Sequence, residues 1–267
     1  MRIEAITSAR NPKIKALLTL QEKSKARREE GLFIVEGRRE LEHCAAAGFR
    51  IRSLFICPAI AGDILAELPD ADVFEVSEEV YRKIAYREGT EGIVAEVYAK
   101  ERRLEDIVLS EHPLVVVLES VEKPGNLGAV LRSADAAGAD AVIICDPATD
   151  LYNPNLIRAS VGSVFTRQVA VATSEETIAW LRAHDIAILT AQLQDSVWYY
   201  DTDMRRGTAL VMGTEATGLT AVWRKAADSH IRIPMLGRLD SLNVSVSAAI
   251  LLFEAVRQRN SGRGEVI

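Results

Sequence analysis

The sequence predicts an α/β protein in which a parallel, doubly wound sheet forms the C-terminal part and a smaller α/β unit precedes it. A length of 267 residues suits two compact domains, at roughly 100–200 residues per domain. With 48% hydrophobic and 26% charged residues, the chain has the composition of a protein that buries a core. Short apolar runs alternate with amphipathic stretches along most of its length, which is typical of alternating strands and helices.

The N-terminal third is expected to open with a helix over residues 11–30. Asn11 is a suitable N-cap, Pro12 fits the first turn and Gly31 is a stop signal. The elements expected after it are strand 32–37, helix 38–48, strand 51–57, helix 61–67, strand 72–76, helix 78–85 and strand 92–98. Residues 31–99 therefore form a small α/β unit.

A charged segment, residues 99–113, separates this unit from a second α/β series. We place the domains at 1–105 and 112–267. The expected strands of the second domain are 114–118, 141–145, 186–189, 209–212 and 230–233, and the helices are about 127–138, 153–161, 175–183, 219–226 and 242–258. Each strand is a short apolar run of the kind buried on both faces of a parallel sheet.

Charge is distributed unevenly along the chain. The net charge of −6 and the pI of about 5.4, taken alone, argue against a nucleic-acid binder. Residues 1–30, however, carry +4, which leaves −10 for the rest. Lys13, Lys15, Arg27 and Arg28 are therefore candidate contacts to an anionic polymer, whose counterions would be released on binding. The alternative is a solvated face of a surface helix.

Several classes of protein have little support. The N-terminus lacks the apolar region of a signal peptide, and no run of roughly 18 apolar residues suggests a membrane span, so we expect a cytoplasmic protein without a membrane partner. Three cysteines have neither disulfide nor metal-site spacing and are interpreted as reduced core thiols. The four histidines form no metal-binding pair, so no metal is expected.

Residues 118–140 are the first stretch with possible chemistry, namely a strand end, a Pro-Gly turn and a helix. The apolar stripe expected to face the sheet is Leu127, Leu131, Ala134 and Gly138. Arg132 lies off this stripe and should point away from the core, and Gly128 one turn earlier leaves room beside it for a ligand. Asn126 is placed as an N-cap. The alternative is that Asn126 only caps and Arg132 is only solvated.

Residues 209–220 contain glycines spaced as in a P-loop, after a strand and before a helix. Leu219 occupies the position of the essential lysine, and Glu215 would repel phosphates, so we exclude a nucleotide triphosphatase. No GxGxxG dinucleotide fingerprint follows any strand. What remains is a turn with Gly213, Gly218 and one carboxylate at the ligand-binding edge of the sheet. An ordinary strand-to-helix turn is the alternative.

The third stretch, residues 231–259, has an unusual helix start. Pro234 ends the strand and Gly237 loosens the loop. Residues 241–247 read SLNVSVS, a poor choice for helix propensity. Ser241 or Asp240 is the expected N-cap, which does not explain Asn243, Ser245 and Ser247 together; function or close packing is the usual reason for such a departure.

Together, the three stretches resemble the signature motifs of the SpoU/TrmH family within the SPOUT superfamily. The motifs are N-x-G-x-x-x-R at 126–132, G-x-E-x-x-G-L at 213–219, and I-P-M-x-G at 233–237 followed by S-L-N-V-S-V at 241–246. The resemblance covers residues 114–259. The N-terminal part, with ITSARNPKIKALLTL and FIVEG, is similar to the RNA substrate-binding domain that precedes many SpoU methyltransferases.

The resemblance implies an S-adenosyl-L-methionine (AdoMet)-dependent RNA 2′-O-ribose methyltransferase with a deep trefoil knot and a homodimer built around it. It assigns Arg132 to activation of the 2′-hydroxyl, and the other active-site positions are Asn126, Glu215, Ser241 and Asn243. The implied cofactor contacts are Gly213, Ile233, Met235 and Leu242. Arginine is a poor base in water, with a pKa above about 12, so Arg132 needs a perturbing environment or help from an RNA phosphate.

Three interpretations of the function stay open at this point. Only RNA carries a 2′-hydroxyl, so the reaction fixes the substrate class. The added N-terminal domain and the LFEAVRQR ending favour ribosomal RNA of the 23S type over tRNA. The third interpretation is a catalytically silent RNA-binding or ribosome-assembly protein of the same fold.

Overall fold

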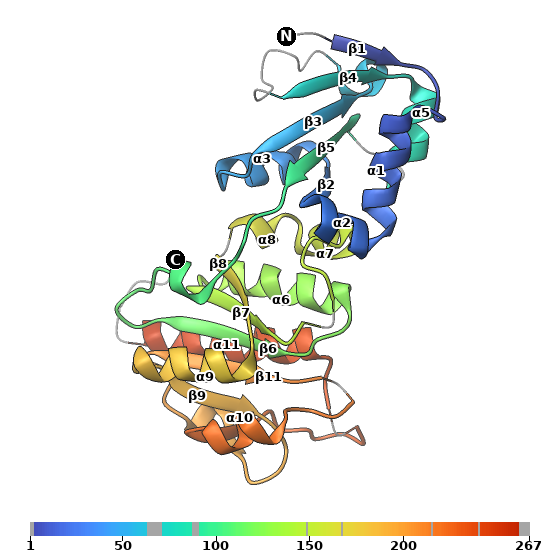
Figure 1. Cartoon of the computed structure of the whole chain (residues 1–267). Coiled ribbons are helices and arrows are strands. Elements are labelled where there is room, and N and C mark those ends of the chain that lie inside the picture. The colour runs from blue at the N-terminus through green and yellow to red at the C-terminus, as the bar shows by residue number, and fades with distance from the viewer. Residues whose placement is uncertain are drawn as a thin grey trace. The chain divides into compact units, whose positions relative to one another are not determined.

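The computed structural model describes residues 3–62, 71–86, 91–147, 149–166, 168–214, 216–239 and 241–261. The chain divides into two compact units, each with its own sheet (Figure 1). The first comprises Met1–Glu101 and Asp150–Thr166, and the second comprises Arg102–Thr149 and Arg167–Ile267. No helix among the described residues has the length and apolar character needed to cross a bilayer.

The first unit contains a mixed sheet in the order β1-β4-β3-β5-β2. Its strands are β1 (Ile3–Ile6), β2 (Leu32–Glu36), β3 (Ile51–Ile56), β4 (Asp72–Val76) and β5 (Ile93–Tyr98). β1, β4 and β3 run parallel, whereas β5 is antiparallel to both β3 and β2. The helices of this unit are α1 (Pro12–Glu22), α2 (Ser24–Glu30), α3 (Arg38–Ala46), α4 (Pro58–Ala61), α5 (Glu78–Ile84), α7 (Pro154–Ser160) and α8 (Ser163–Thr166).

The predicted helix over 11–30 has the expected ends but is not continuous. The Asn11 side chain accepts a hydrogen bond from the Lys13 amide, and Gly31 ends α2 at φ +62°. At Lys23 the backbone is extended, and this residue separates α1 from α2. Lys23 has no turn-forming side chain, so the break could not be predicted from the residue type. The helix expected over 61–67 lies mostly outside the described residues, and α4 ends at Ala61.

The second unit confirms the predicted parallel sheet, with every described strand pair parallel in the order β10-β12-β9-β11-β6-β7-β8. Its strands are β6 (Leu114–Glu119), β7 (Ala141–Cys145), β8 (Gln168–Ala172), β9 (Ala187–Ala191), β10 (Val197–Trp198), β11 (Thr208–Met212) and β12 (Ser229–Arg232). β8 and β10 were not predicted. They are the two edges of the sheet. β10 has only two residues, whereas β8 is a short apolar run, QVAVA, that had not been assigned as a strand.

Helices cover both faces of this sheet (Figure 1). They are α6 (Pro124–Ala136), α9 (Ser174–Ala183), α10 (Ala221–Ala226) and α11 (Val244–Asn260), with short 3₁₀ turns η2 (Leu104–Asp106) and η3 (Tyr199–Asp201). α11 packs against α6 and β11, whereas α9 and α10 pack against each other and against β9. Leu181 of α9 and Trp223 of α10 enter the same apolar core as Val115 and Val117 of β6.

Residues 150–166 lie between β7 and β8 in sequence but pack with the first unit. The Arg27 Nε atom lies 2.5 Å from an Asp150 carboxylate oxygen, and the Arg27 guanidinium also donates to the backbone oxygens of Leu20 and Gln21. The Phe33 ring stacks on Tyr152 with centroids 4.2 Å apart. These long-range contacts join a segment of the second predicted domain to the core of the first unit.

We expect Arg27→Ala to lower the free energy of unfolding by about 3–5 kcal/mol, because it leaves a shielded carboxylate without its partner. The side chains of Arg27 and Asp150 are only 3% and 13% exposed. Urea unfolding followed by circular dichroism measures the effect. Arg28→Ala is the matched control, since that side chain is exposed and its loss should cost less than about 0.5 kcal/mol. Equal midpoints for the two variants would contradict the structural role of Arg27.

Candidate active site

A cavity of about 360 Å³ in the second unit lies at the carboxyl edge of the parallel sheet. Ligands of open α/β folds bind at this edge, and the volume lies in the range of small-molecule sites, roughly 300–1,000 Å³. Residues at the ends of β9, β11 and β12 and the start of α11 line it. The predicted positions among these lining residues are Gly213, Ile233, Met235, Ser241 and Leu242.

The loop after β11 forms one wall of this cavity with its backbone. A Cβ atom on Gly213 would lie 2.3 Å from the Gly218 carbonyl oxygen and 2.6 Å from the Leu219 nitrogen. Gly218 itself has φ +67°, and its amide donates to the Thr214 carbonyl oxygen at 3.0 Å. The two motif glycines therefore allow the loop to close on itself, which a side chain at Gly213 would prevent.

The start of α11 differs from the expectation. Asn243 is the N-cap, and its Oδ1 accepts from the Ser245 amide at 2.9 Å and from the Ser245 hydroxyl at 2.6 Å. The predicted cap at Ser241 or Asp240 was wrong: Ser241 lies before the cap, on the cavity wall, and Asp240 lies outside the described residues. Ser247 also lines the cavity, so the residues of poor helix propensity serve the cap and the cavity wall.

A second cavity of about 130 Å³ adjoins the first. Val121, Glu122, Lys123 and Asn126 line one side of it, at the end of β6 and the start of α6. The residues that line both cavities are Gly213, Thr214, Ala216 and Val244. A ligand in the larger cavity and a substrate group in the smaller one would therefore meet at the glycine loop.

The structure brings two of the predicted catalytic residues into contact. The Asn243 side-chain nitrogen donates to the Asn126 side-chain oxygen at 3.1 Å, although 117 positions separate them. We had predicted that Asn126 caps this helix. That prediction was wrong, because α6 already begins at Pro124 with Lys123 as its N-cap. The Asn126 amide is therefore available to the start of α11 instead of to the backbone of its own helix.

Two other predicted catalytic residues are placed differently. Arg132 is exposed on α6, as expected, and lines neither cavity. Glu215 lies outside the described residues. Of the predicted apolar stripe, Leu127, Leu131 and Ala134 are buried, whereas Gly138 is exposed beyond the end of α6 at φ +66°. Gly138 belongs to the turn after the helix and not to the face that packs on the sheet.

Some of the lining residues had not been predicted. Arg224 and Arg232 line the larger cavity, and no carboxylate is found among its described lining residues, so these walls are cationic. The Arg232 guanidinium lies 4.3 Å from the centre of the Trp198 ring. Residues 191–194 also line the cavity. They lie soon after the predicted strand 186–189, which was a usable signal, because the carboxyl ends of parallel strands meet at one edge.

His, Cys, Asp and Glu side chains in the described part of the chain are the groups on which metal binding or thiol chemistry would depend. No group of three or more His, Cys, Asp or Glu side chains there is arranged to hold a metal ion. All three cysteines are buried. Burial raises the pKa of the Cys145 thiol to about 12, so this group stays protonated at neutral pH.

The basic N-terminal segment presents only part of its predicted charge to solvent. Lys15 and Arg28 are exposed. Lys13 is partly exposed, pairs with Glu4 at 2.6 Å and lies over the Phe74 ring. Arg27 is 4% exposed and fully engaged by Asp150 and backbone oxygens, so its assignment as an RNA contact was wrong. Helix periodicity turns Arg27 towards the protein, which the charge count did not reveal.

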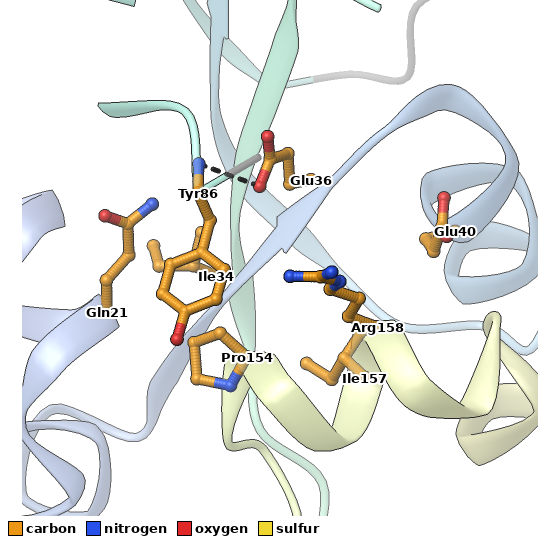
Figure 2. A pocket seen from close by; sticks show the side chains of 8 residues that line it. All are labelled: Gln21, Ile34, Glu36, Glu40, Tyr86, Pro154, Ile157 and Arg158. Atoms are coloured by element: carbon orange, nitrogen blue, oxygen red, sulfur yellow. Dashed lines mark hydrogen bonds between the residues drawn. The ribbon is translucent and has the colours of Figure 1, made fainter. Parts of the chain in front are cut away.

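The first unit also contains a small cavity beside α7 (Figure 2). Its walls include Gln21, Ile34, Tyr86 and Arg158, and a Glu36 carboxylate oxygen accepts from the Tyr86 amide at 3.0 Å. A volume of about 20 Å³ is enough for a single water molecule, which needs about 10–15 Å³. This cavity is too small for a substrate or cofactor.

Comparison with known proteins gives matches over both units. Residues 113–253 match the SpoU rRNA Methylase family, and residues 11–95 match the MRM3-like substrate binding domain. The 23S rRNA (uridine(2479)-2′-O)-methyltransferase of Streptomyces viridochromogenes is 30% identical over 275 aligned residues, covering 96% of this chain and 93% of that protein.

Two crystal structures are similar over nearly the whole chain. One, of an RNA 2′-O ribose methyltransferase, is 40% identical with a TM-score of 0.83 and covers 96% of this chain and 99% of its own. The other, of an AdoMet-bound rRNA methyltransferase from Sinorhizobium meliloti, is 34% identical with a TM-score of 0.86 and covers 96% of this chain and 98% of its own.

We predict that Gly213→Ala weakens AdoMet binding about tenfold or more, because forcing a methyl group into a packed site costs about 1–3 kcal/mol. Isothermal titration calorimetry measures the affinity. Gly237→Ala is the control, since a Cβ there meets no atom within 4 Å. Unchanged affinity in Gly213→Ala would show that the loop does not form the cofactor wall.

Proposed function

This chain belongs to the SpoU rRNA methylase family, and we propose that it transfers a methyl group from AdoMet to a ribose 2′-hydroxyl of ribosomal RNA. The observation that carries the proposal is the pair of adjoining cavities, one lined by the expected cofactor contacts and the other by Asn126. They share the wall formed by Gly213 and Thr214, so donor and acceptor would face each other there.

The larger cavity suits AdoMet in volume and chemistry. Apolar side chains such as Ile231, Ile233 and Leu251 suit an adenine ring. Gly213 and Gly218 also line the cavity, and because they have no side chains a ligand can approach the backbone there. The cationic walls near Arg224 and Arg232 suit a carboxylate. When bound, AdoMet supplies an activated methyl group on a sulfonium.

The protein's own contribution is positioning and removal of one proton. Asn126 and Asn243 hold each other at the border of the cavities, where their amides can orient a ribose hydroxyl. Arg132 is proposed to activate that hydroxyl with the help of an RNA phosphate that takes up the proton, and Glu215 and Ser241 complete the polar set. Because Arg132 lines neither cavity of its own chain, we propose that it serves the site of a second subunit.

A homodimer is therefore part of the proposal. Val246 and Phe253 on α11 are 46% and 49% exposed, and their spacing of seven residues puts them on one face of the helix. Leu236 and Leu239 in the preceding loop are 98% and 76% exposed. We propose that these side chains contribute to the subunit interface, since an exposed apolar patch marks such an interface. A monomer mass in sedimentation at micromolar concentration would contradict the dimer.

We also propose the deep trefoil knot that the family resemblance implies. β12 is separated from β6 by β9 and β11, yet Asn243, soon after β12, contacts Asn126, soon after β6. Residues 233–242 must therefore cross the ends of two strands, past the loop after β11. Such a knot would also require this segment to thread a loop, a step that most folds avoid.

Ribosomal RNA is favoured over tRNA as the substrate. One relative that aligns with 96% of the chain is a 23S rRNA 2′-O-methyltransferase, and the N-terminal unit also matches a substrate binding domain. We propose that this unit holds the RNA, that the enzyme works in the cytoplasm, and that the functional domains are 1–105 and 112–267.

The test of the reaction is methyl transfer to ribosomal RNA, mapped by mass spectrometry. We expect the wild type to methylate one ribose and Arg132→Ala to be slower by about 10²–10⁴-fold, the usual contribution of a proton-transfer group. AdoMet affinity should stay unchanged in this variant, and Arg132→Lys tests whether charge alone suffices. Equal loss of rate and AdoMet affinity would show that Arg132 is structural.

A second test concerns the basic segment. Replacing Lys13, Lys15 and Arg28 together by Gln should weaken RNA binding and lower its logarithmic salt dependence by about 2–3, since each phosphate contact contributes about 0.7–0.9. Filter binding at several salt concentrations measures the slope, and AdoMet affinity serves as the control for folding. An unchanged slope would rule out this segment as an RNA contact.

A further inference from the structure

A buried carboxylate that the proposed mechanism does not use lies at the end of β6. Glu119 is 3% exposed and lines neither cavity. One of its oxygens accepts from the Thr220 amide at 2.8 Å, and the other accepts from the Thr220 hydroxyl at 2.7 Å. A single threonine therefore holds both oxygens of a buried acid, across 101 positions of sequence.

Thr220 departs from the normal behaviour of its position. It is the backbone N-cap of α10, but its side chain makes no capping hydrogen bond. By contrast, the cap residues Thr173 and Asn243 accept bonds from amides of their own helices. The Thr220 hydroxyl is instead turned to Glu119, so the capping bond is given up for the contact with β6.

Ser174, the first residue of α9, also contacts Glu119 and belongs to a network of hydrogen bonds. The Ser174 hydroxyl lies 3.3 Å from the Glu119 carboxylate, donates to Asp146 at 2.7 Å and accepts from the Trp223 ring nitrogen at 2.9 Å. A hydroxyl has one proton, and the shorter contact assigns it to Asp146. The two bonds from Thr220 are therefore the main ones to Glu119, and the network behind it fixes where the carboxylate stands.

The two ends of this contact lead directly to the two cavities. Gly218 and Leu219, just before Thr220, line the larger cavity. Val121 to Lys123, just after Glu119, line the smaller one. The bond between Glu119 and Thr220 thus joins the wall of the cofactor cavity to the wall of the substrate cavity.

We propose that Glu119 is a positioning residue that sets the spacing between the loop after β11 and the entry to α6. The inference rests on the proposed function, because the spacing matters only if a methyl donor and a ribose hydroxyl meet between these walls. A misplacement of about 1 Å can slow such a transfer by about 100-fold. Since both oxygens are held by Thr220 and the group is buried, Glu119 does not itself reach the reacting atoms.

Thr220→Val tests the contact without disturbing the core, because this side chain is exposed. Valine keeps the shape and the backbone amide but removes the hydroxyl donor. We expect the single-turnover rate of methyl transfer at saturating AdoMet and RNA to fall about tenfold, the low end for a hydrogen bond to a charged group. RNA affinity should be unchanged, and Thr220→Ser, which keeps the hydroxyl, should restore the rate to within about threefold of the wild type.

Substitutions of Glu119 separate positioning from proton transfer. In Glu119→Gln the amide oxygen can accept from the Thr220 amide, and the NH₂ group can donate to the Thr220 hydroxyl oxygen. We therefore expect Glu119→Gln to keep the rate within about threefold and Glu119→Ala to lose about 100-fold. All rates are measured well below the melting temperature of each variant.

The outcomes are decisive in both directions. A wild-type rate in Thr220→Val, or equal losses in Glu119→Gln and Glu119→Ala, would overturn the positioning role. If Glu119→Ala does not fold, the pair Thr220→Val and Thr220→Ser decides. Failure of the wild type to methylate RNA would instead defeat the proposed function, so the two failures are distinguishable.

Discussion

The return of the chain from β12 to α6 is the constraint on which the candidate site depends. β9 and β11 lie between β12 and β6 in the sheet, so residues 233–242 must cross both strand ends before α11 can pack on α6. The crossing carries the polar start of α11 to Asn126 and closes the space above the loop after β11. If the chain after β12 stayed on that side of the sheet, the motif around Asn126 and the motif around Asn243 would lie on separate surfaces.

Close backbone packing around this crossing explains why the site is built from glycines and small polar residues. The loop after β11 folds back until Gly213 touches Gly218, and α11 begins with a cap that uses Asn243 and Ser245. Such a start gives up helix propensity, and the packing of α11 against α6 and β11 compensates. The helix propensity of these residues and their place in the tertiary structure conflict here because the segment lines a cavity.

The helices and strands were predicted well from the sequence, whereas the capping and ion-pairing roles of individual residues were predicted less well. The second sheet is parallel as expected, because its buried strands have a strong apolar signal, whereas the edge strands β8 and β10 were missed. The motif positions Gly213, Ile233, Met235 and Leu242 do lie on one cavity, but neither Asn126 nor Ser241 is a cap. Arg27 was misassigned because its partner Asp150 is far away in sequence. Capping and ion pairing depend on which distant segment arrives at a residue, and periodicity alone does not contain that information.

Methyl transfer from a sulfonium asks little covalent chemistry of a protein, so geometry carries most of the catalytic effect. This accounts for the distribution of polar groups in the second unit. The buried charge of Glu119 is used to hold Thr220, and the Asn126–Asn243 pair joins two helices. Each of these contacts connects segments that belong to different motifs. Loss of one partner from a buried polar contact is costly, so these contacts hold the loops firmly in place. The spacing of the two cavities is therefore a property of the whole fold and not of any one loop.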